Sequence, residues 1–239
     1  MGVLAMAESK PGGMVSFACR RFQKGCWNDI EDDVAPETAL ILHFPGRPAQ
    51  RLWAYPEELD LLALGHAALD LCQPGQAPVI AEACENTFWL GVIPAPERDE
   101  APGFTLTAGE IMEAMAAFIS APGRWEGTGC FHRAALFDPV SKSFARRAED
   151  IGRHNCIDRL AGYAVREGDT LARYALFASA RMTASLAAKA ARAGFRLIVS
   201  RSAVTTAAID VAQEAGVTLA GFARENRFTV FADHAGRIA

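Results

Sequence analysis

The most constraining feature of the sequence is a regular alternation of short apolar runs with helical segments from residue 127 onward. The apolar runs have the length and composition of strands, and Gly194 and Gly216 each follow a helical segment that they would end. Such alternation is typical of a sheet covered by helices. We expect strands at 130–137, 174–178, 196–200, 217–222 and 228–232, and helices at 152–165, 182–193 and 205–215.

The chain before this alternation predicts a smaller α+β unit. Two strand pairs, 39–44 with 49–54 and 78–83 with 87–92, surround a helix that begins near Pro56. A proline-rich linker and a helix from Thr107 to Ser120 then follow. We therefore divide the chain into a poorly packed arm (1–33), a small α+β domain (34–106) and an α/β domain (107–239).

Charge and cysteine spacing exclude several classes of protein. The net charge of −4 gives no general attraction to nucleic acid or to an acidic membrane. No apolar run reaches the roughly 18 residues of a membrane-spanning helix, and the first residues do not form a signal peptide, so we expect a cytoplasmic protein. The six cysteines form no C-x-x-C pair, which argues against a zinc ribbon, and we predict no metal site.

The densest polar patch is the segment Glu149–Asn155 at the mouth of a predicted helix. Asp150 could cap this helix, Arg153 could bind an anion, and His154 adds a titratable imidazole. The alternative is an ordinary capped helix start with a solvated face.

Three further patches lie where a strand meets a loop or a helix. Ser200–Thr206 offers Arg201, hydroxyl groups and a helix start at Thr205, which suits a phosphate or a pterin oxygen. Gly221–Arg227 places two arginines at a strand end, and Gly127–His132 places Cys130 and His132 on one side of a predicted strand. Each patch alone could be capping, a charged hairpin tip or a buried thiol. Open α/β sheets bind ligands at such strand ends, so we predict one shared site, whose ligand this placement alone does not name.

Several blocks of the sequence resemble the FdhD/NarQ family in order and spacing. The resemblance runs from about residue 34 to residue 232 and is most specific in the EDIGRHN segment. The matching blocks are VAPETALILHFPG with YPEELDLLALG (34–65), TGCFHRAALF (128–137), EDIGRHNCIDRLAG (149–162), SRSAVTT (200–206) and GFARENR (221–227).

This resemblance implies a cytidine-deaminase-like three-layer α/β/α domain preceded by a smaller domain. It also implies an accessory protein for formate dehydrogenase, with the dehydrogenase catalytic subunit and a cysteine desulfurase as partners, and a homodimer. The implied cargo is the bis(molybdopterin guanine dinucleotide) form of the molybdenum cofactor. The family's cofactor-binding segment matches Phe222, Ala223, Arg224, Glu225, Asn226 and Arg227.

The polar patches then take specific roles in this hypothesis. We expect Arg224 and Arg227 to hold cofactor phosphates beside Arg201 and the helix start at Thr205. The remaining members of the expected pocket are Asp150, Arg153 and His154. Replacing Arg227 with alanine is expected to weaken binding of a guanine nucleotide.

The sequence departs from the family in its sulfur chemistry. Members usually carry a C-x-x-C pair before the T-G-x-x-H segment, and one of those cysteines takes the persulfide. The corresponding stretch here, 85–104, has no cysteine, and Ser185 and Val204 replace the usual Glu and Pro. Among the cysteines near the matching blocks, which are Cys84, Cys130 and Cys156, we select Cys130 as the candidate persulfide carrier because of its flanking glycines and His132.

Four functions compete on these observations. The first is a cofactor-binding accessory protein that promotes sulfuration, protection or insertion of the cofactor, and the second is an active sulfurtransferase with a relocated cysteine. A zinc deaminase would need H-x-E and P-C-x-x-C, whereas His132 is followed by Arg133 and Ala134. The fourth is a structural interaction protein with a vestigial pocket.

Overall fold

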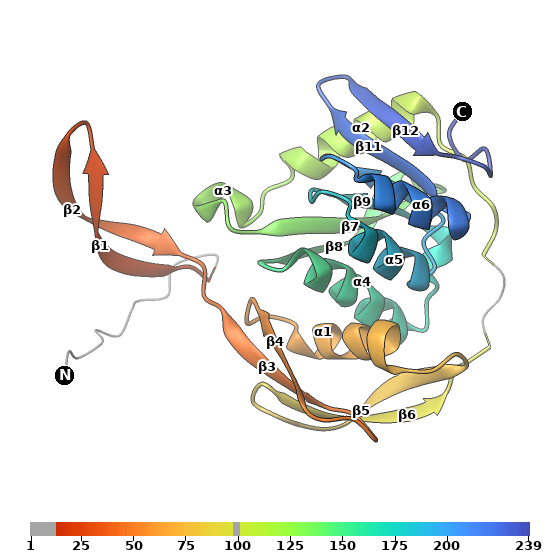
Figure 1. The fold of residues 1–239 in the computed structure, drawn as a ribbon, viewed down its shortest axis with the longest axis horizontal. Coiled ribbons are helices and arrows are strands. Elements are labelled where there is room, and N and C mark those ends of the chain that lie inside the picture. The colour runs from red at the N-terminus through yellow and green to blue at the C-terminus, as the bar shows by residue number, and fades with distance from the viewer. Residues whose placement is uncertain (1–12, 98–100) are drawn as a thin grey trace.

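The computed structural model describes residues 13–97 and 101–239, and Figure 1 shows a two-part body from which a hairpin projects. The larger part is built on a six-stranded sheet in the order β12-β11-β10-β9-β7-β8. Strands β9, β10 and β11 are parallel, while β7, β8 and β12 run antiparallel to their neighbours. The strands are β7 (His132–Asp138), β8 (Ser143–Asp150), β9 (Ala175–Ala178), β10 (Leu197–Ser200), β11 (Thr218–Arg224) and β12 (Arg227–Ala232).

Helices cover both faces of this sheet. The buried residues of β9 alternate, with Leu176 in the core under one group of helices and Phe177 in the core under the other, as the twofold repeat of a strand requires. One face carries α4 (Arg153–Glu167), α5 (Ala184–Arg192) and α6 (Thr206–Glu214), and the opposite face carries α2 (Ala108–Ser120). The predicted three-layer α/β/α architecture is confirmed.

The helix ends follow the expected local chemistry. Thr107 caps α2 in a capping box, because its hydroxyl accepts a hydrogen bond from Glu110 N while the Glu110 carboxylate accepts one from Thr107 N. Gly194 and Gly216 follow α5 and α6 with φ values of 94° and 64°. Glycine adopts this left-handed conformation without strain, so each can end its helix.

The smaller part is a four-stranded sheet covered by one helix. The strand order is β4-β3-β6-β5, and Leu40, Leu42, Leu62 and Phe88 lie in its separate hydrophobic core. Its elements are β3 (Thr38–His43), β4 (Gln50–Ala54), α1 (Leu59–His66), the π-helical turn η1 (Ala67–Leu71), β5 (Gln76–Cys84) and β6 (Thr87–Pro94). Both strand pairs and the helix predicted for this region are therefore present. Residues 98–100 of the predicted linker lie outside the described residues.

The two parts meet where α1 crosses α4. A Cβ atom added to Gly162 of α4 would lie 1.9 Å from the carbonyl oxygen of Leu61, and one added to Gly65 of α1 would lie 1.7 Å from that of Asp158. Both distances are far below van der Waals contact. The crossing therefore requires glycine on each helix.

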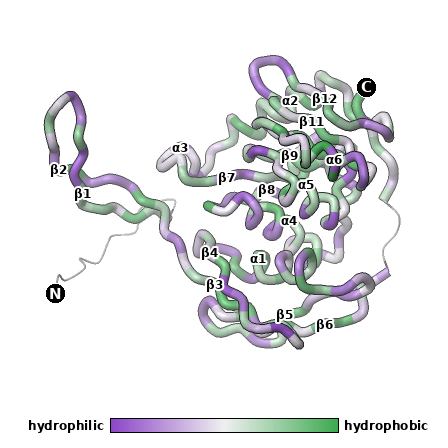
Figure 2. Tube along the Cα trace, in the orientation of Figure 1, coloured by the Kyte–Doolittle hydropathy of each residue, from purple (hydrophilic) through white to green (hydrophobic). Residues whose placement is uncertain are grey.

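Residues 15–34, which belong to the predicted poorly packed arm, form a regular hairpin that the sequence did not indicate, and most of its side chains are exposed. Strand β1 (Val15–Gln23) pairs antiparallel with β2 (Cys26–Val34), and residues 1–12 lie outside the described part. Lys24 and Gly25 have φ values of 52° and 81°, the left-handed pair that tight hairpin turns use. Figure 2 shows hydrophilic and hydrophobic positions interspersed along this hairpin.

Three further elements complete the fold and were not predicted. Strand β8 occupies a stretch with three charged residues among its last four, and it lies at the edge of the large sheet. The others are α3 (Trp125–Thr128) and the 3-10 turn η2 (Leu171–Arg173). Because β7 begins at His132, the predicted start of this strand at Cys130 is wrong.

Candidate functional site

All four polar patches lie at one edge of the large sheet. Ser200 at the end of β10 pairs in register with Ala178 at the end of β9, and Ala178 also lies opposite Ala134 near the start of β7. His132 at the start of β7 lies opposite Asp150 at the end of β8. This edge, which we call the arginine edge, faces the side of α3 and also receives the first turns of α4, α5 and α6 (Figure 1).

Three arginines at this edge have no acidic partner among the residues that the structure describes. Arg153 begins α4, Arg181 follows β9 and Arg201 follows β10. None of the three forms an ion pair within residues 13–97 and 101–239. The edge therefore combines unneutralised guanidinium groups with helix N-termini, and both attract anions.

Arg181 was missed from the sequence, although a signal for it was present. The strand at 174–178 was predicted, and Arg181 is the first basic residue beyond its carboxyl end. The rule that ligands bind at the carboxyl ends of parallel strands applies to this position as well.

The positive charge at the edge acts on two imidazoles. Burial, with the added repulsion of Arg153 and Arg181, lowers the pKa of His132 below its ordinary value. Burial, followed by the charges of Arg153 and Lys189, also lowers the pKa of His154. Both rings are thus neutral near pH 7, and His154 Nε2 lies 3.1 Å from the Ser185 hydroxyl at the start of α5.

A cavity of about 510 Å³ opens between α2 and the turn that joins β11 to β12. Its apolar wall includes Met112, Met115 and Ile119 of α2, together with Ala223. Its polar wall includes Glu113, Arg201, Arg224, Glu225 and Asn226. Sequence reasoning identified Arg201 and the turn but not the contribution of α2, because nothing in the local pattern places that helix beside the strand ends.

The turn itself has unusual backbone geometry. Phe222, Glu225 and Asn226 have positive φ values of 53°, 54° and 61°, and the pairing of β11 with β12 is irregular between Gly221 and Arg224. Phe222 N donates a hydrogen bond of 2.9 Å to Ser202 O. The two predicted segments are thereby fixed to each other, and the turn is strongly hydrophilic (Figure 2).

Several predicted ligand residues lie at the edge but outside this cavity. Arg227 is exposed, with Nη2 4.0 Å from Glu225, and Phe222 packs near Phe231. The Thr205 hydroxyl accepts a hydrogen bond from Ala208 N as the cap of α6. Arg153 and His154 also do not line the cavity, so their contact with a ligand stays a prediction.

The expectation that Asp150 caps the helix is wrong. The N-cap of α4 is Gly152, and the Asp150 side chain is fully buried. Its carboxylate accepts hydrogen bonds from Gly152 N, from Asn155 Nδ2 and from Arg159, whose Nη2 lies 2.6 Å away. Arg159 in turn donates to the carbonyl oxygens of Tyr55, Glu57 and Glu58. Asp150 therefore joins the arginine edge to the smaller part of the molecule.

The cysteines differ sharply in accessibility. Cys156 is buried on α4, its thiol donates to His132 O at 3.4 Å, and burial raises its pKa far above the ordinary value. Cys130 is exposed in the loop between α3 and β7, after Gly129 in the left-handed conformation. Cys156 is thus unsuitable as a nucleophile, whereas Cys130 is accessible at the arginine edge.

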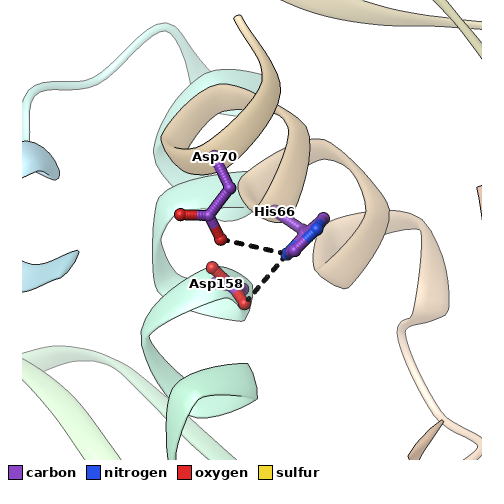
Figure 3. A group of neighbouring side chains, drawn as sticks. All are labelled: His66, Asp70 and Asp158. Carbon is purple, nitrogen blue, oxygen red and sulfur yellow. Dashed lines mark ion pairs between the residues drawn. The ribbon is translucent and has the colours of Figure 1, made fainter. Parts of the chain in front are cut away.

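A second charged cluster lies between the two parts, where α1 and η1 meet α4. Figure 3 shows His66 and Asp70 from the α1–η1 helical stretch meeting Asp158 of α4. Lys189 Nζ lies 2.6 Å from Asp158 Oδ1 and 2.7 Å from Asp70 Oδ2. Although His66, Asp70 and Asp158 are close enough to ligate a metal, this ammonium already takes the place of a cation between the carboxylates. We assign the cluster to docking of α1 onto α4 and α5.

The FdhD/NarQ family model matches residues 75–239 of the chain. A relative from Geobacillus kaustophilus, named sulfur carrier protein FdhD, is 36% identical over 94% of this chain and 99% of its own length. The chain belongs to the FdhD/NarQ family. A second FdhD relative, from Chromobacterium violaceum, is 30% identical and covers 92% of this chain and 95% of its own.

A solved structure supports the same fold. The crystal structure of a protein from Desulfotalea psychrophila, described as a formate dehydrogenase accessory protein, superposes with a TM-score of 0.78. The alignment covers 95% of this chain and 99% of that chain at 20% identity. In the part of the chain that the structure describes, no helix is both long and apolar enough to cross a membrane.

Proposed function

We propose that this FdhD/NarQ protein binds the bis(molybdopterin guanine dinucleotide) cofactor at the arginine edge as cargo for formate dehydrogenase. The observation that carries the proposal is a set of three arginines, Arg153, Arg181 and Arg201, which lie beside three helix starts and form no ion pair with any described residue. A ligand with several phosphates would neutralise this charge with bidentate hydrogen bonds. The proposal is also supported by the names of two similar proteins, which are a sulfur carrier protein and a formate dehydrogenase accessory protein.

The adjoining cavity suits the guanine part of such a ligand. Met112, Met115 and Ile119 offer an apolar surface on which a planar ring can lie. Glu113, Glu225 and Asn226 offer oxygens that can accept hydrogen bonds from the N1 and N2 groups of guanine. In this arrangement Arg201 and Arg224 lie between the base and the phosphates. The protein then protects the cofactor or promotes its sulfuration or insertion.

The test is calorimetric titration with guanosine diphosphate, the nucleotide portion of the cofactor. Replacing Arg201 or Arg224 with alanine is expected to weaken binding roughly tenfold to a hundredfold, since a hydrogen bond to a charged group contributes about 1.5–3 kcal/mol. Arg227→Ala tests whether recognition extends beyond the cavity. Arg173→Ala is the matched control, because Arg173 precedes β9 and so lies at the opposite edge of the sheet. If both alanine variants, Arg201→Ala and Arg224→Ala, bind guanosine diphosphate as tightly as the wild type does, the proposed binding site is wrong.

A second candidate activity is transfer of sulfur by Cys130. It is favoured by the exposure of this thiol at the same edge, while Cys156 is buried. The Cys130 thiolate would attack the outer sulfur of a desulfurase persulfide, forming a new S–S bond as the desulfurase thiolate leaves. The product is a persulfide on Cys130, with no external oxidant or reductant.

This activity predicts an all-or-none result. The protein is incubated with a cysteine desulfurase and cysteine and then examined by mass spectrometry. The wild type and the control variant Cys84→Ser should each gain the mass of one sulfur atom, whereas Cys130→Ser should gain none. If Cys130→Ser still forms a persulfide, Cys130 is not the carrier. That result would not affect the proposal that the protein binds a nucleotide. Absence of persulfide in the wild type would leave cofactor binding as the activity of the chain.

A further inference from the structure

The two ends of the β1–β2 hairpin enter one small apolar cluster at its base. Met14, which immediately precedes β1, is only 6% exposed and packs with Tyr55 and Phe131. Ala35, which immediately follows β2, packs against the same cluster, as does Ile151. The rest of the hairpin extends away from the body (Figure 1), and most of its side chains are exposed. We call this cluster of five residues the hairpin root, because it is the apolar anchor of the hairpin.

Close contacts with Tyr55 fix the hairpin root. The Tyr55 and Phe131 rings meet edge to face, with their centres 5.1 Å apart. A Cβ atom added to Gly13 would lie 2.0 Å from the Tyr55 hydroxyl oxygen, so the chain enters the hairpin directly against this ring. The Arg124 guanidinium lies 4.5 Å from the centre of the same ring. Since Tyr55 follows β4, the root joins the hairpin to the smaller part of the molecule.

Phe131 of the root is the chain neighbour of an exposed thiol. Phe131 is 1% exposed, whereas Cys130 is exposed at the arginine edge. Consecutive Cα atoms are roughly 3.8 Å apart, so Phe131 cannot leave the root without moving Cys130. The pKa of His132, two residues from the thiol, is lowered by burial and then by Arg153 and Arg181, so their positive charge reaches this loop.

The segment before Cys130 depends on the same contacts. Helix α3 has only four residues, too few to be stable alone, and it lies against β2. Arg124 at its N-cap lies on the Tyr55 ring and forms an ion pair with Glu57. Cys130 N donates a hydrogen bond of 3.2 Å to the Thr128 hydroxyl at the end of α3. Both sides of the thiol are thus held by the root or by residues that touch it.

We propose that the hairpin root holds Cys130 in place at the arginine edge, with Met14 and Phe131 as its positioning residues. Cys130 itself lies in a loop between α3 and β7, so the packing on its two sides decides where the thiol lies. The inference rests on the proposed sulfur transfer for its purpose, but the position of the thiol can be measured without any sulfur donor. It gives the hairpin a part in the chemistry, although none of its described residues lines the cavity beside the β11–β12 turn.

The first test compares alkylation of Cys130 by neutral iodoacetamide and by anionic iodoacetate, with the site identified by peptide mass spectrometry. The positive charge of the arginine edge concentrates anions, so the wild type is expected to favour iodoacetate at low salt. Met14→Ala and Phe131→Ala should each lower the ratio of the two rate constants about threefold or more, because the released thiol moves away from these charges. Cys84 of the same protein is the internal reference, and its ratio should not change.

Two control variants separate positioning from a general loss of structure. Met14→Leu keeps the volume of the anchor and should keep the wild-type ratio. Phe22→Ala also removes an apolar side chain of the hairpin, but Phe22 is 59% exposed and lies beside the turn, so this variant should match the wild type. Melting curves verify that the body remains folded. If Phe131→Ala does not fold, Met14→Ala decides alone, because Met14 lies outside both cores of the larger part.

The second test measures sulfur transfer from a cysteine desulfurase to Cys130 at increasing desulfurase concentration. A misplaced thiol reacts more slowly after the donor has bound, so Met14→Ala should lower kcat roughly tenfold while KM changes little. A change confined to KM would place Met14 in contact with the donor and would contradict the positioning role.

Unchanged alkylation ratios in Met14→Ala and Phe131→Ala would overturn the inference, and so would an equal loss in Met14→Leu. If the wild type takes up no sulfur, the proposed sulfur transfer is wrong, while the alkylation ratios still decide whether the root holds Cys130.

Discussion

Replacing Gly162 with alanine is expected to destabilise the protein by about 3 kcal/mol, lowering its melting temperature by roughly 6–12 °C. The added methyl group would lie 1.9 Å from the carbonyl oxygen of Leu61, an atom of the α1 backbone that no side-chain rotation can move. Alanine has a better intrinsic helix propensity than glycine by about 1 kcal/mol, but this gain is smaller than the cost of separating two packed helices. Urea denaturation followed by circular dichroism measures the difference.

Gly109→Ala is the matched control for this change. Gly109 also lies in a helix, but the nearest atom to its added Cβ is Thr107 Oγ1 at 3.9 Å. We expect no loss of stability there and a gain of up to about 1 kcal/mol. If Gly162→Ala and Gly109→Ala have the same stability, α1 and α4 do not cross as closely as described.

Replacing Lys189 with methionine is expected to cost about 3–5 kcal/mol, because it leaves the buried Asp158 carboxylate without its main counter-charge. Lys189 Nζ donates hydrogen bonds of 2.6 and 2.8 Å to the two oxygens of Asp158, and both side chains are almost fully buried. Arg192→Met is the control, since Arg192 also pairs with Asp70 but its side chain is half exposed, and its loss should cost about 0–1 kcal/mol. If the two variants lose similar amounts of stability, the buried pair of Lys189 and Asp158 is not more important than the exposed one.

The measurement belongs near pH 7, where His66 adds a second positive charge to the cluster. Burial lowers the pKa of His66, but hydrogen bonds to Asp158 and Asp70 outweigh it and raise the pKa to about 9. The folded state therefore keeps a proton that the unfolded chain loses at about pH 6.5. The resulting stabilisation is complete below pH 6.5 and disappears as the pH rises through about 9.

The sequence predicted the layered domain well because its signals are local. The strands β9, β10 and β11 are short apolar runs, Gly194 and Gly216 follow the two helices between them, and the Thr205 cap marks the start of the second. Strand β8 was missed because half-buried Arg146 and exposed Arg147 are adjacent, which interrupts the apolar alternation by which a strand is recognised. The hairpin was missed because Lys24 and Gly25 are a weak turn signal beside an acidic run.

The candidate site was predictable in its parts but not in its assembly. Strand ends and helix starts identified Arg153, Arg201 and Arg224 one segment at a time. No local pattern indicates that Asp150 is buried, since its partner Arg159 is fixed by carbonyl oxygens about a hundred residues earlier. The contribution of α2 to the cavity likewise depends on which face of the sheet this helix covers.

Helix α4 begins with Arg153 and His154 at the arginine edge and continues through Asp158, Arg159 and Gly162, all of which hold the smaller part in place. The residues proposed to recognise the ligand and those that hold the smaller part thus lie on one helix of 15 residues. An activity assay alone therefore cannot explain a loss of function that is caused by a substitution in α4. Only a melting curve recorded beside a binding isotherm distinguishes a damaged ligand contact from a detached domain.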